Sequence, residues 1–164
     1  MTNMDVNQIK MDRMRYTKNK LSANLVLCAI LFDVLYFVDL YRSDVGSYYY
    51  TILIGASIIY NLVFLLAAFL CSEGVKSRKS NFMPALLVLG IGQFVRMFII
   101  PAQAHSALIK GTETLVMADG QYFFMIAMLA LSGVCCIAAG ITSFLQNKSL
   151  NSYLNSIQSP TKAR

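Results

Sequence analysis

The sequence predicts an all-α, polytopic membrane protein: a bundle of four transmembrane helices with both termini on the cytoplasmic side. Hydrophobic residues make up 57% of the 164 positions and charged residues only 13%, whereas a soluble domain has roughly 25% charged residues. The hydrophobic residues fall in four blocks of about 20, the length that crosses roughly 30 Å of hydrocarbon. The basic residues flank these blocks, and their distribution gives the orientation.

We divide the chain into a basic N-terminal segment (1–20), a four-helix membrane domain (21–145) and a C-terminal tail (146–164). The N-terminal segment has only a weak amphipathic pattern, which is compatible with a short interfacial helix or with disorder at its extreme end. The first span covers about 21–41. This block is too long for the hydrophobic region of a signal peptide, and no A-x-A-like cleavage site follows it, so we expect it to stay attached.

A polar turn at 42–47 leads to the second span, at about 50–71, and a basic connection at 72–80 leads to the third, at about 82–100. Pro84 lies in the first turn of the third span, where its missing N–H costs little. Pro101 marks the point where this helix ends or kinks. In the long connection at about 101–120, residues 102–110 are expected to continue as a helix that stops at Gly111.

The fourth span covers about 121–145, and its helical pattern continues beyond the membrane. Leu150, Leu154 and Ile157 recur at helical spacing, with polar residues opposite them. We therefore expect a short amphipathic extension of this helix, into the cytoplasm or along the membrane, as far as Ser159 and Pro160.

The number of Lys and Arg residues in each connection predicts the orientation. The N-terminal segment carries five, the second connection three and the C-terminal tail three, whereas the first and third connections carry one each. Eleven basic residues against two predict that both termini are cytoplasmic. The net charge of +6 therefore does not indicate nucleic acid, because the basic residues do not gather with aromatic residues on one polar face. We expect the membrane that holds the protein to be a bacterial plasma membrane.

Four polar side chains interrupt the spans: Asp33, Asn61, Gln93 and Arg96. At about 1.5 Å per residue, Asp33 lies roughly 3 Å and Arg96 roughly 6–8 Å outward of the midplane, and the other two lie close to it. A charged side chain near the centre costs about 2.5–3.5 kcal/mol. We therefore expect all four to face the interior of the bundle, with Asp33 paired to Arg96. Gly92, on the face of Arg96, is expected to let another helix approach.

Two interpretations of this network stay open. In the first, it fixes helix register and partner choice; in the second, it lines a path or binds a polar ligand. A single acid–base pair without a ladder of ionisable groups is a poor ion relay, which favours the first interpretation.

The fourth span also carries a candidate helix-packing face, in which Ser132, Cys136 and Gly140 recur every four residues. Small residues at this spacing let two helices approach closely, either within the bundle or at a contact with another protein. The four cysteines, at positions 28, 71, 135 and 136, are expected to be small packing residues. His105 is expected to be a solvated loop residue.

No catalytic, cofactor-binding or metal-ligating motif occurs in the sequence, so we expect neither an enzyme nor a cofactor or metal site. The favoured function is a non-catalytic, small integral membrane subunit. Its partners are the lipid bilayer and, through the transmembrane helices, a second copy or a larger membrane complex such as a transporter. The alternative is a small oligomeric channel or carrier that uses Asp33 and Arg96, and a membrane-bound enzyme is the least favoured class.

Overall fold

A computed structural model describes residues 3–42, 51–106, 108, 115 and 117–158, and the regular elements within these ranges are helices. They are α1 (Asn3–Tyr16), α2 (Lys20–Arg42), α4 (Thr51–Lys76), α5 (Phe82–Met97), α6 (Ile100–His105) and α7 (Asp119–Gln158). Four helical stretches are long and apolar enough to cross a membrane: Lys20–Tyr41, Gly55–Lys76, Phe82–His105 and Asp119–Asn155. This confirms the prediction of an all-helical, multi-pass membrane protein with four spans.

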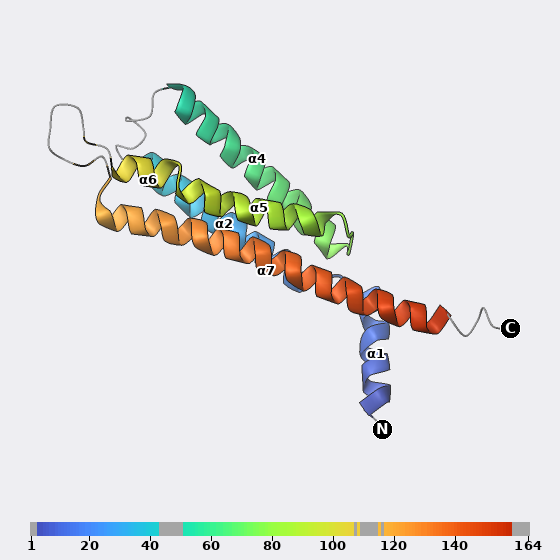
Figure 1. Ribbon diagram of the computed structural model, residues 1–164. Helices are drawn as coiled ribbons and strands as arrows, with labels where there is room; N and C mark the ends of the chain where they lie inside the picture. Colours follow the sequence, from blue (N-terminus) through green and yellow to red (C-terminus); the bar gives the residue numbers. More distant parts are fainter. Residues whose placement is uncertain (1–2, 43–50, 107, 109–114, 116, 159–164) are drawn as a thin grey trace.

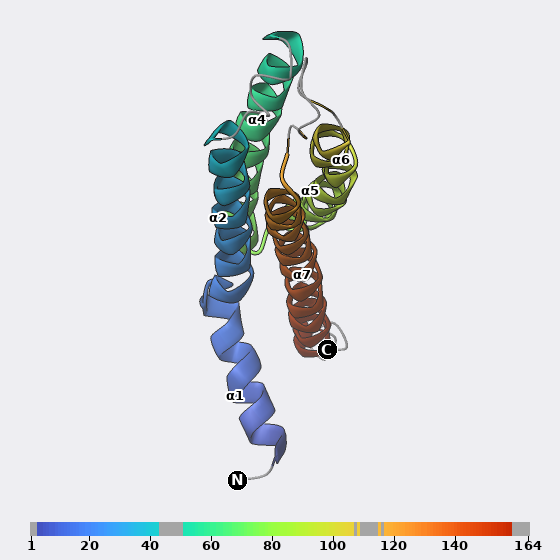
Figure 2. The ribbon, with the colours of Figure 1, turned by 90° about the vertical axis from the view of Figure 1, so that its left-hand side faces the viewer.

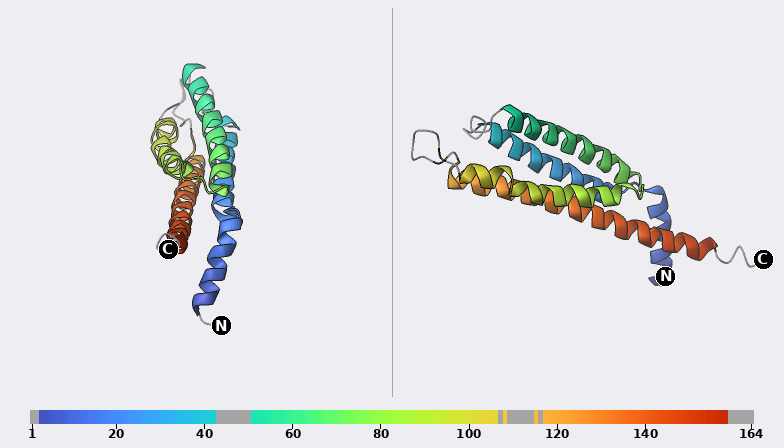
Figure 3. Two further views of the ribbon diagram at one scale, coloured as in Figure 1. Left: turned by 90° about the vertical axis from the view of Figure 1, so that its right-hand side faces the viewer. Right: turned by 45° about the horizontal axis from the view of Figure 1, so that its top comes forward.

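The four spans lie side by side, and α7 is the helix on which α2 and α5 assemble (Figure 1 and Figure 3). α2 and α5 each pack along α7, whereas α4 packs mainly on α2 and more sparsely on α5. Both chain ends lie toward the same end of the bundle, where α1 leaves it from the start of α2 (Figure 2). We call this end, with Asn19 and the 77–81 turn, the terminal end, and the end with α6 the loop end.

The second span ends later than the sequence predicted. α4 continues to Lys76, five residues beyond the expected end at 71. The amide N–H of Lys79 donates to the carbonyl of Gly74 and that of Arg78 to the carbonyl of Val75, both at 3.0 Å. This is the Schellman arrangement of a helix end, with Arg78 in the left-handed region at φ 58°. Two carbonyl groups in the last turn of α4 therefore accept hydrogen bonds from the backbone of the following turn. A helix that ended at residue 71 would not form these bonds.

The third span is broken before Pro101, at Phe98 and Ile99, between α5 and α6. Both residues donate their amide N–H groups to carbonyls three residues earlier, at 3.1 Å, which is the tighter geometry common at helix ends. α6 ends at His105, so the helix expected over residues 102–110 is confirmed for 102–105 and is wrong for Ser106 and Leu108, the described residues beyond them. The hydroxyl of Ser106 donates to the carbonyl of Gln103 at 3.0 Å, and Leu108 instead forms an isolated antiparallel bridge with Leu115.

The fourth span belongs to a continuous helix of 40 residues, α7. At 1.5 Å per residue it is about 60 Å long, twice the roughly 30 Å of hydrocarbon, so it projects past the other helices at the terminal end (Figure 1). α1 is helical from Asn3 to Tyr16. The hydroxyl of Tyr153 on α7 donates to Asp12 on α1 at 3.0 Å. The expected first connection at 42–47, the start of the second span, the stop at Gly111 and the end of the tail fall wholly or partly outside the described residues.

Two apolar clusters fill the bundle, one toward each end. The cluster at the loop end contains Tyr36 of α2, Met97 of α5 and Leu129 of α7. The cluster at the terminal end is built from residues farther toward that end on each helix, such as Val26, Leu86, Cys136 and Ala139. On α2, α5 and α7, buried polar residues lie between the two clusters. The core is therefore divided by a polar layer.

Candidate functional site

The polar layer contains the four polar residues singled out in the spans. Asp33 comes from α2, Asn61 from α4, and Gln93 and Arg96 from α5. Their side chains are buried: Asp33 and Gln93 are 0%, Asn61 1% and Arg96 4% exposed. Three helices thus bring all four residues to one level of the bundle.

Asp33 and Arg96 form an ion pair at the centre of this layer. Nη1 of Arg96 donates to Oδ1 of Asp33 at 3.0 Å, and Nη2 of Arg96 donates to Oδ1 of Asn61. Nε2 of Gln93 donates to the same Asp33 oxygen at 2.9 Å. One carboxylate oxygen therefore accepts two hydrogen bonds, and one guanidinium connects α2, α4 and α5.

Three further side chains complete the layer. The guanidinium of Arg96 lies over the ring of Tyr36, 4.4 Å from its centroid, and over the ring of Tyr60, at 4.9 Å. Such contacts between a cation and an aromatic face are worth about 2 kcal/mol or more when desolvated. Ser132 of α7 accepts a bond from Gln93 Nε2 at 3.4 Å and donates to the carbonyl of Ala29 at 3.0 Å. The two tyrosine rings thus place electron-rich faces against the buried guanidinium, and Ser132 connects α7 to the polar layer.

Sequence reasoning missed Tyr36 and Tyr60, and assigned Ser132 only to packing. A signal existed for both tyrosines: Tyr36 lies three residues after Asp33, on the same helix face, and Tyr60 lies beside Asn61. An aromatic residue with a polar tip in mid-span is a natural neighbour for a buried cation.

The polar layer leaves some of its own atoms without partners. Oδ2 of Asp33, Nδ2 of Asn61 and Oε1 of Gln93 are buried and have no hydrogen-bond partner among the described residues. Buried polar atoms normally find a partner. These atoms are therefore the places where a water molecule or a polar group from another molecule would gain a hydrogen bond.

The predicted packing face is buried inside the bundle. Ser132, Cys136 and Gly140 all lie against neighbouring helices, and a Cβ on Gly140 would meet the Leu87 side chain at 3.3 Å. This face therefore holds α7 against α2 and α5 and is not available to another protein.

Among the described glycines, Gly90 and Gly133 lie nearest to the backbone of another helix. A Cβ on Gly90 would lie 3.0 Å from the carbonyl oxygen of Gly133, and a Cβ on Gly133 3.1 Å from that of Gly90. At Gly92 it is a side chain of another helix that approaches, because a Cβ there would meet the hydroxyl of Tyr60 of α4 at 3.1 Å. α5 turns Gly90 toward α7, whereas Gly92 faces the more distant α4.

His105 differs from its expected solvated state. Its ring stacks on Tyr122 with centroids 4.3 Å apart, and Nε2 lies 3.7 Å from Oδ1 of Asp119. These contacts join α6 to the start of α7. The four cysteines are free thiols, with Cys71 and Cys136 buried and Cys28 exposed. Within the described ranges, no three His, Cys, Asp or Glu side chains gather as metal ligands.

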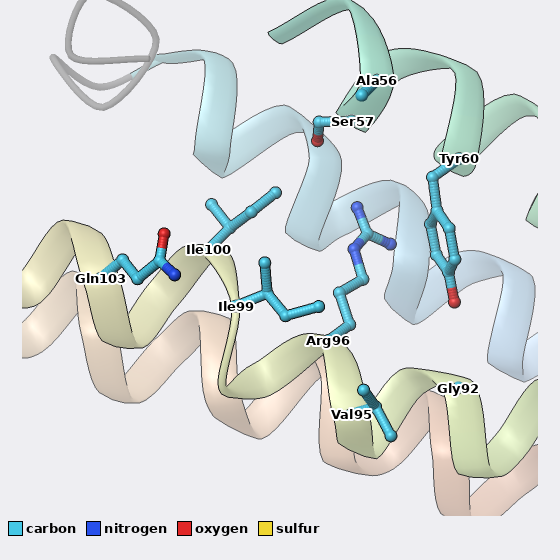
Figure 4. A pocket seen from close by; sticks show the side chains of 9 residues that line it. All are labelled: Ala56, Ser57, Tyr60, Gly92, Val95, Arg96, Ile99, Ile100 and Gln103. Atoms are coloured by element: carbon cyan, nitrogen blue, oxygen red, sulfur yellow. The ribbon is translucent and has the colours of Figure 1, made fainter. Parts of the chain in front are cut away.

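A groove of about 360 Å³ reaches the polar layer from the side, between α4 and the α5–α6 pair. Figure 4 shows Arg96 at its base, with Tyr60 and Ser57 on the α4 side. Val95 and Ile99 line it and are 54% and 51% exposed, so it opens on the outer face of the bundle. The Ser57 hydroxyl is buried and has no hydrogen-bond partner within the described part of the chain. This groove is the surface route to the network.

The chain matches no known protein family, no curated protein and no solved structure. Its function is therefore argued from the network and the groove.

Proposed function

We propose that this protein is a small, non-catalytic integral membrane subunit that assembles through its transmembrane helices, with itself or with a larger membrane complex such as a transporter. The network of Asp33, Asn61, Gln93 and Arg96 fixes the helix arrangement, and the lateral groove between α4 and α5 receives a transmembrane segment of the partner.

The observation that carries this proposal is the isolation of the ion pair. Between the polar layer and the terminal end, the described parts of the four spans contain only four charged residues, Lys20, Glu73, Lys76 and Lys148, and no His. All four lie toward the terminal end, several turns from Asp33 and Arg96. An ion or proton crossing the membrane needs a succession of polar sites. A single buried pair without further charged groups around it suits a fixed structural connection between helices better than a conduction path.

The groove supports assembly because its composition suits a helix partner. Its walls are mostly apolar, and the buried Ser57 hydroxyl lacks a hydrogen-bond partner. In a membrane, helices associate through close packing and through hydrogen bonds between polar side chains. A partner helix with a hydrogen-bonding residue opposite Ser57 would satisfy both requirements.

A small oligomeric channel or carrier is the second candidate. It is favoured by the unpartnered atoms Asp33 Oδ2, Asn61 Nδ2 and Gln93 Oε1, which could hydrate or hold a polar ligand next to Arg96. In that case, the double variant Asp33→Asn, Arg96→Gln would stay folded and assembled but lose flux.

Filling the groove tests the assembly proposal. We expect Val95→Trp to block the groove and to dissociate the complex, measured by chemical cross-linking in membranes and by size in mild detergent. Val88→Trp is the matched control, because Val88 is on the same helix, is 69% exposed and lies outside the groove. The proposal fails if Val95→Trp assembles as the wild type does, or if both variants dissociate equally.

The orientation is a separate proposal: the protein lies in a bacterial plasma membrane, with both termini on the cytoplasmic side. Its support is the positive-inside distribution of Lys and Arg. In a cysteine-free background, Ser106→Cys is expected to react with a membrane-impermeant maleimide added to intact cells, and Ser77→Cys only after lysis. Both serines are exposed in the structure. The reverse labelling pattern would overturn the orientation.

A further inference from the structure

A cleft between α5 and α7 at the terminal end has an apolar half of about 520 Å³. Leu87 of α5 and Gly140, Ile141 and Phe144 of α7 line it. The side chains of Ile141 and Phe144 are about half exposed. A hydrocarbon chain lying in this trough would contact side chains of its own polarity.

The trough leads into a polar half of about 530 Å³. Ser80, Met83 and Phe144 line both halves, so the two spaces adjoin. Arg78 and Lys148 bring two cationic groups to the polar half. The residues that line it, all of them described, include neither Asp nor Glu. The cleft therefore joins a hydrocarbon-like surface to a cationic one.

The levels of the two halves match the layers of a bilayer. The middle of the third span, Phe82–His105, falls between residues 93 and 94. At about 1.5 Å per residue, Leu87 then lies roughly 10 Å and Ser80 roughly 20 Å from the midplane. The hydrocarbon reaches about 15 Å from the midplane, and the head groups about 20–22 Å. The apolar half thus lies among acyl chains and the polar half among head groups, in either orientation of the protein.

In the polar half, some buried hydrogen-bonding groups have no partner among the described residues. Nε of Arg78 donates to the carbonyl of Thr17 at 3.1 Å, but its Nη1 is buried without a partner among the described residues. Asn147 is 8% exposed, and its Nδ2 donates to the carbonyl of Arg78 at 3.2 Å. Its Oδ1 has no partner in the described structure. Two residues that line the polar half therefore each have an unpaired group: the Nη1 donor of Arg78 and the Oδ1 acceptor of Asn147.

The electrostatics of Arg78 point to an anion. Burial lowers the pKa of this guanidinium, which means that its surroundings disfavour the charge. A phosphate group beside it would offset that cost and could accept bonds from Nη1, because guanidinium–phosphate pairs are among the strong hydrogen bonds of proteins. The free Oδ1 of Asn147 suits a hydroxyl of the same head group.

We propose that this cleft binds an anionic phospholipid. One acyl chain lies along Leu87 and Ile141, the phosphate lies between Arg78 and Lys148, and a head-group hydroxyl donates to Asn147. This site is separate from the lateral groove and does not depend on which partner the subunit has.

Binding of phosphatidylglycerol to the purified full-length protein tests the site, with phosphatidylcholine as the neutral comparison. In mild detergent, native mass spectrometry is expected to retain phosphatidylglycerol in preference to phosphatidylcholine. Lys148→Glu is expected to weaken phosphatidylglycerol binding roughly thirtyfold, because each basic residue near an anionic lipid contributes about a fivefold effect and the charge is reversed. Lys148 is exposed, and equal melting temperatures in phosphatidylcholine would show that the variant is folded.

Lys79→Glu is the matched control, because Lys79 lies beside Arg78 in the same turn and is exposed, but does not line the cleft. We expect it to weaken binding less than threefold, and Ile141→Trp, which fills the trough, to weaken binding more than Val134→Trp on the same helix. Equal binding of the two lipids overturns the proposal, as does equal loss in the two charge variants, which would indicate only general surface charge. Competition by millimolar inorganic phosphate would identify a soluble-anion site instead of a lipid site.

Discussion

Replacing Arg96 with glutamine is expected to lower the free energy of unfolding by about 3 kcal/mol. The Asp33 carboxylate is fully buried, and Nη1 of Arg96 lies 3.0 Å from it. Without the guanidinium, the carboxylate keeps only the bond from Gln93, and an uncompensated charge near the bilayer centre costs about 2.5–3.5 kcal/mol. Asp33→Asn is expected to have a similar effect, because it leaves the guanidinium without its counter-ion. Unfolding in mixed micelles with increasing dodecyl sulfate measures both changes.

The double variant Asp33→Asn, Arg96→Gln tests whether the pair acts as a unit. It removes both charges, and amides at both positions can still form hydrogen bonds with each other and with Gln93. We expect it to be more stable than the sum of the two single changes by about 1–3 kcal/mol, as for residues in one network, and to recover much of the lost assembly. If neither single change altered stability, assembly or flux, both interpretations of the pair would be wrong.

An exposed ion pair provides the control for these variants. Nζ of Lys76 lies 2.7 Å from Oε1 of Glu73, one turn apart at the end of α4. Exposed pairs contribute roughly 0–1 kcal/mol, so Glu73→Gln is expected to change the stability by less than about 1 kcal/mol. An effect as large as that of Arg96→Gln would mean that the measurement does not distinguish buried from exposed charge.

Gly90→Ala is expected to destabilise the bundle by about 2–3 kcal/mol, at the upper end of the usual cost of overpacking. The added Cβ would lie 2.6 Å from Cγ1 of Ile137 and 3.0 Å from the carbonyl oxygen of Gly133. A side chain can rotate away, but the Gly133 carbonyl belongs to the backbone of α7. α5 and α7 would therefore have to separate, and the contacts of Gln93 with Ser132 across the same interface would lengthen.

Gly55→Ala is the matched control, because a Cβ on Gly55 of α4 would meet nothing within 4 Å. Alanine is about 1 kcal/mol better than glycine within a helix, so this change is expected to be neutral or slightly stabilising. The same dodecyl sulfate titration compares the two variants. If Gly90→Ala were as mild as Gly55→Ala, the α5–α7 contact would be looser than described.

The spans and the polar layer could be predicted because the membrane imposes strong rules on sequence. Four blocks of about 20 apolar residues have few alternatives in a bilayer. A charged residue inside such a block is costly enough that it must turn inward, and only Asp33 and Arg96 of opposite sign were available at similar depths. The structure brings these two together with Asn61 and Gln93.

The helix ends and the close contacts could not be predicted, because they depend on neighbours that are distant in sequence. The extension of α4 to Lys76 depends on the turn geometry around Arg78, a residue type that rarely adopts positive φ. The spacing of small residues every four positions predicted a packing face at Ser132, Cys136 and Gly140, which are all buried. Among the described glycines, however, Gly90 and Gly133 lie nearest to the backbone of another helix. The location of this contact is set by how α5 and α7 cross, which a one-dimensional pattern does not contain.

The groove and the terminal-end cleft are likewise products of packing. Ser57 and Arg96 come from different helices, and nothing in the sequence indicates that the two residues line one groove. In the sequence, Arg78 and Lys148 indicate only topology, whereas in the structure both line the polar half of the cleft. Basic residues at a membrane boundary can therefore serve orientation and lipid binding together.

The composition of the particle that the wild-type chain forms in mild detergent tests the central claim, assembly through transmembrane helices, most directly. Native mass spectrometry is expected to show two or more copies of the chain, or the chain with another membrane protein in fixed stoichiometry, and Val95→Trp should release it while Val88→Trp does not. A single copy carrying only lipid and detergent, in the wild type and both variants, would contradict the claim.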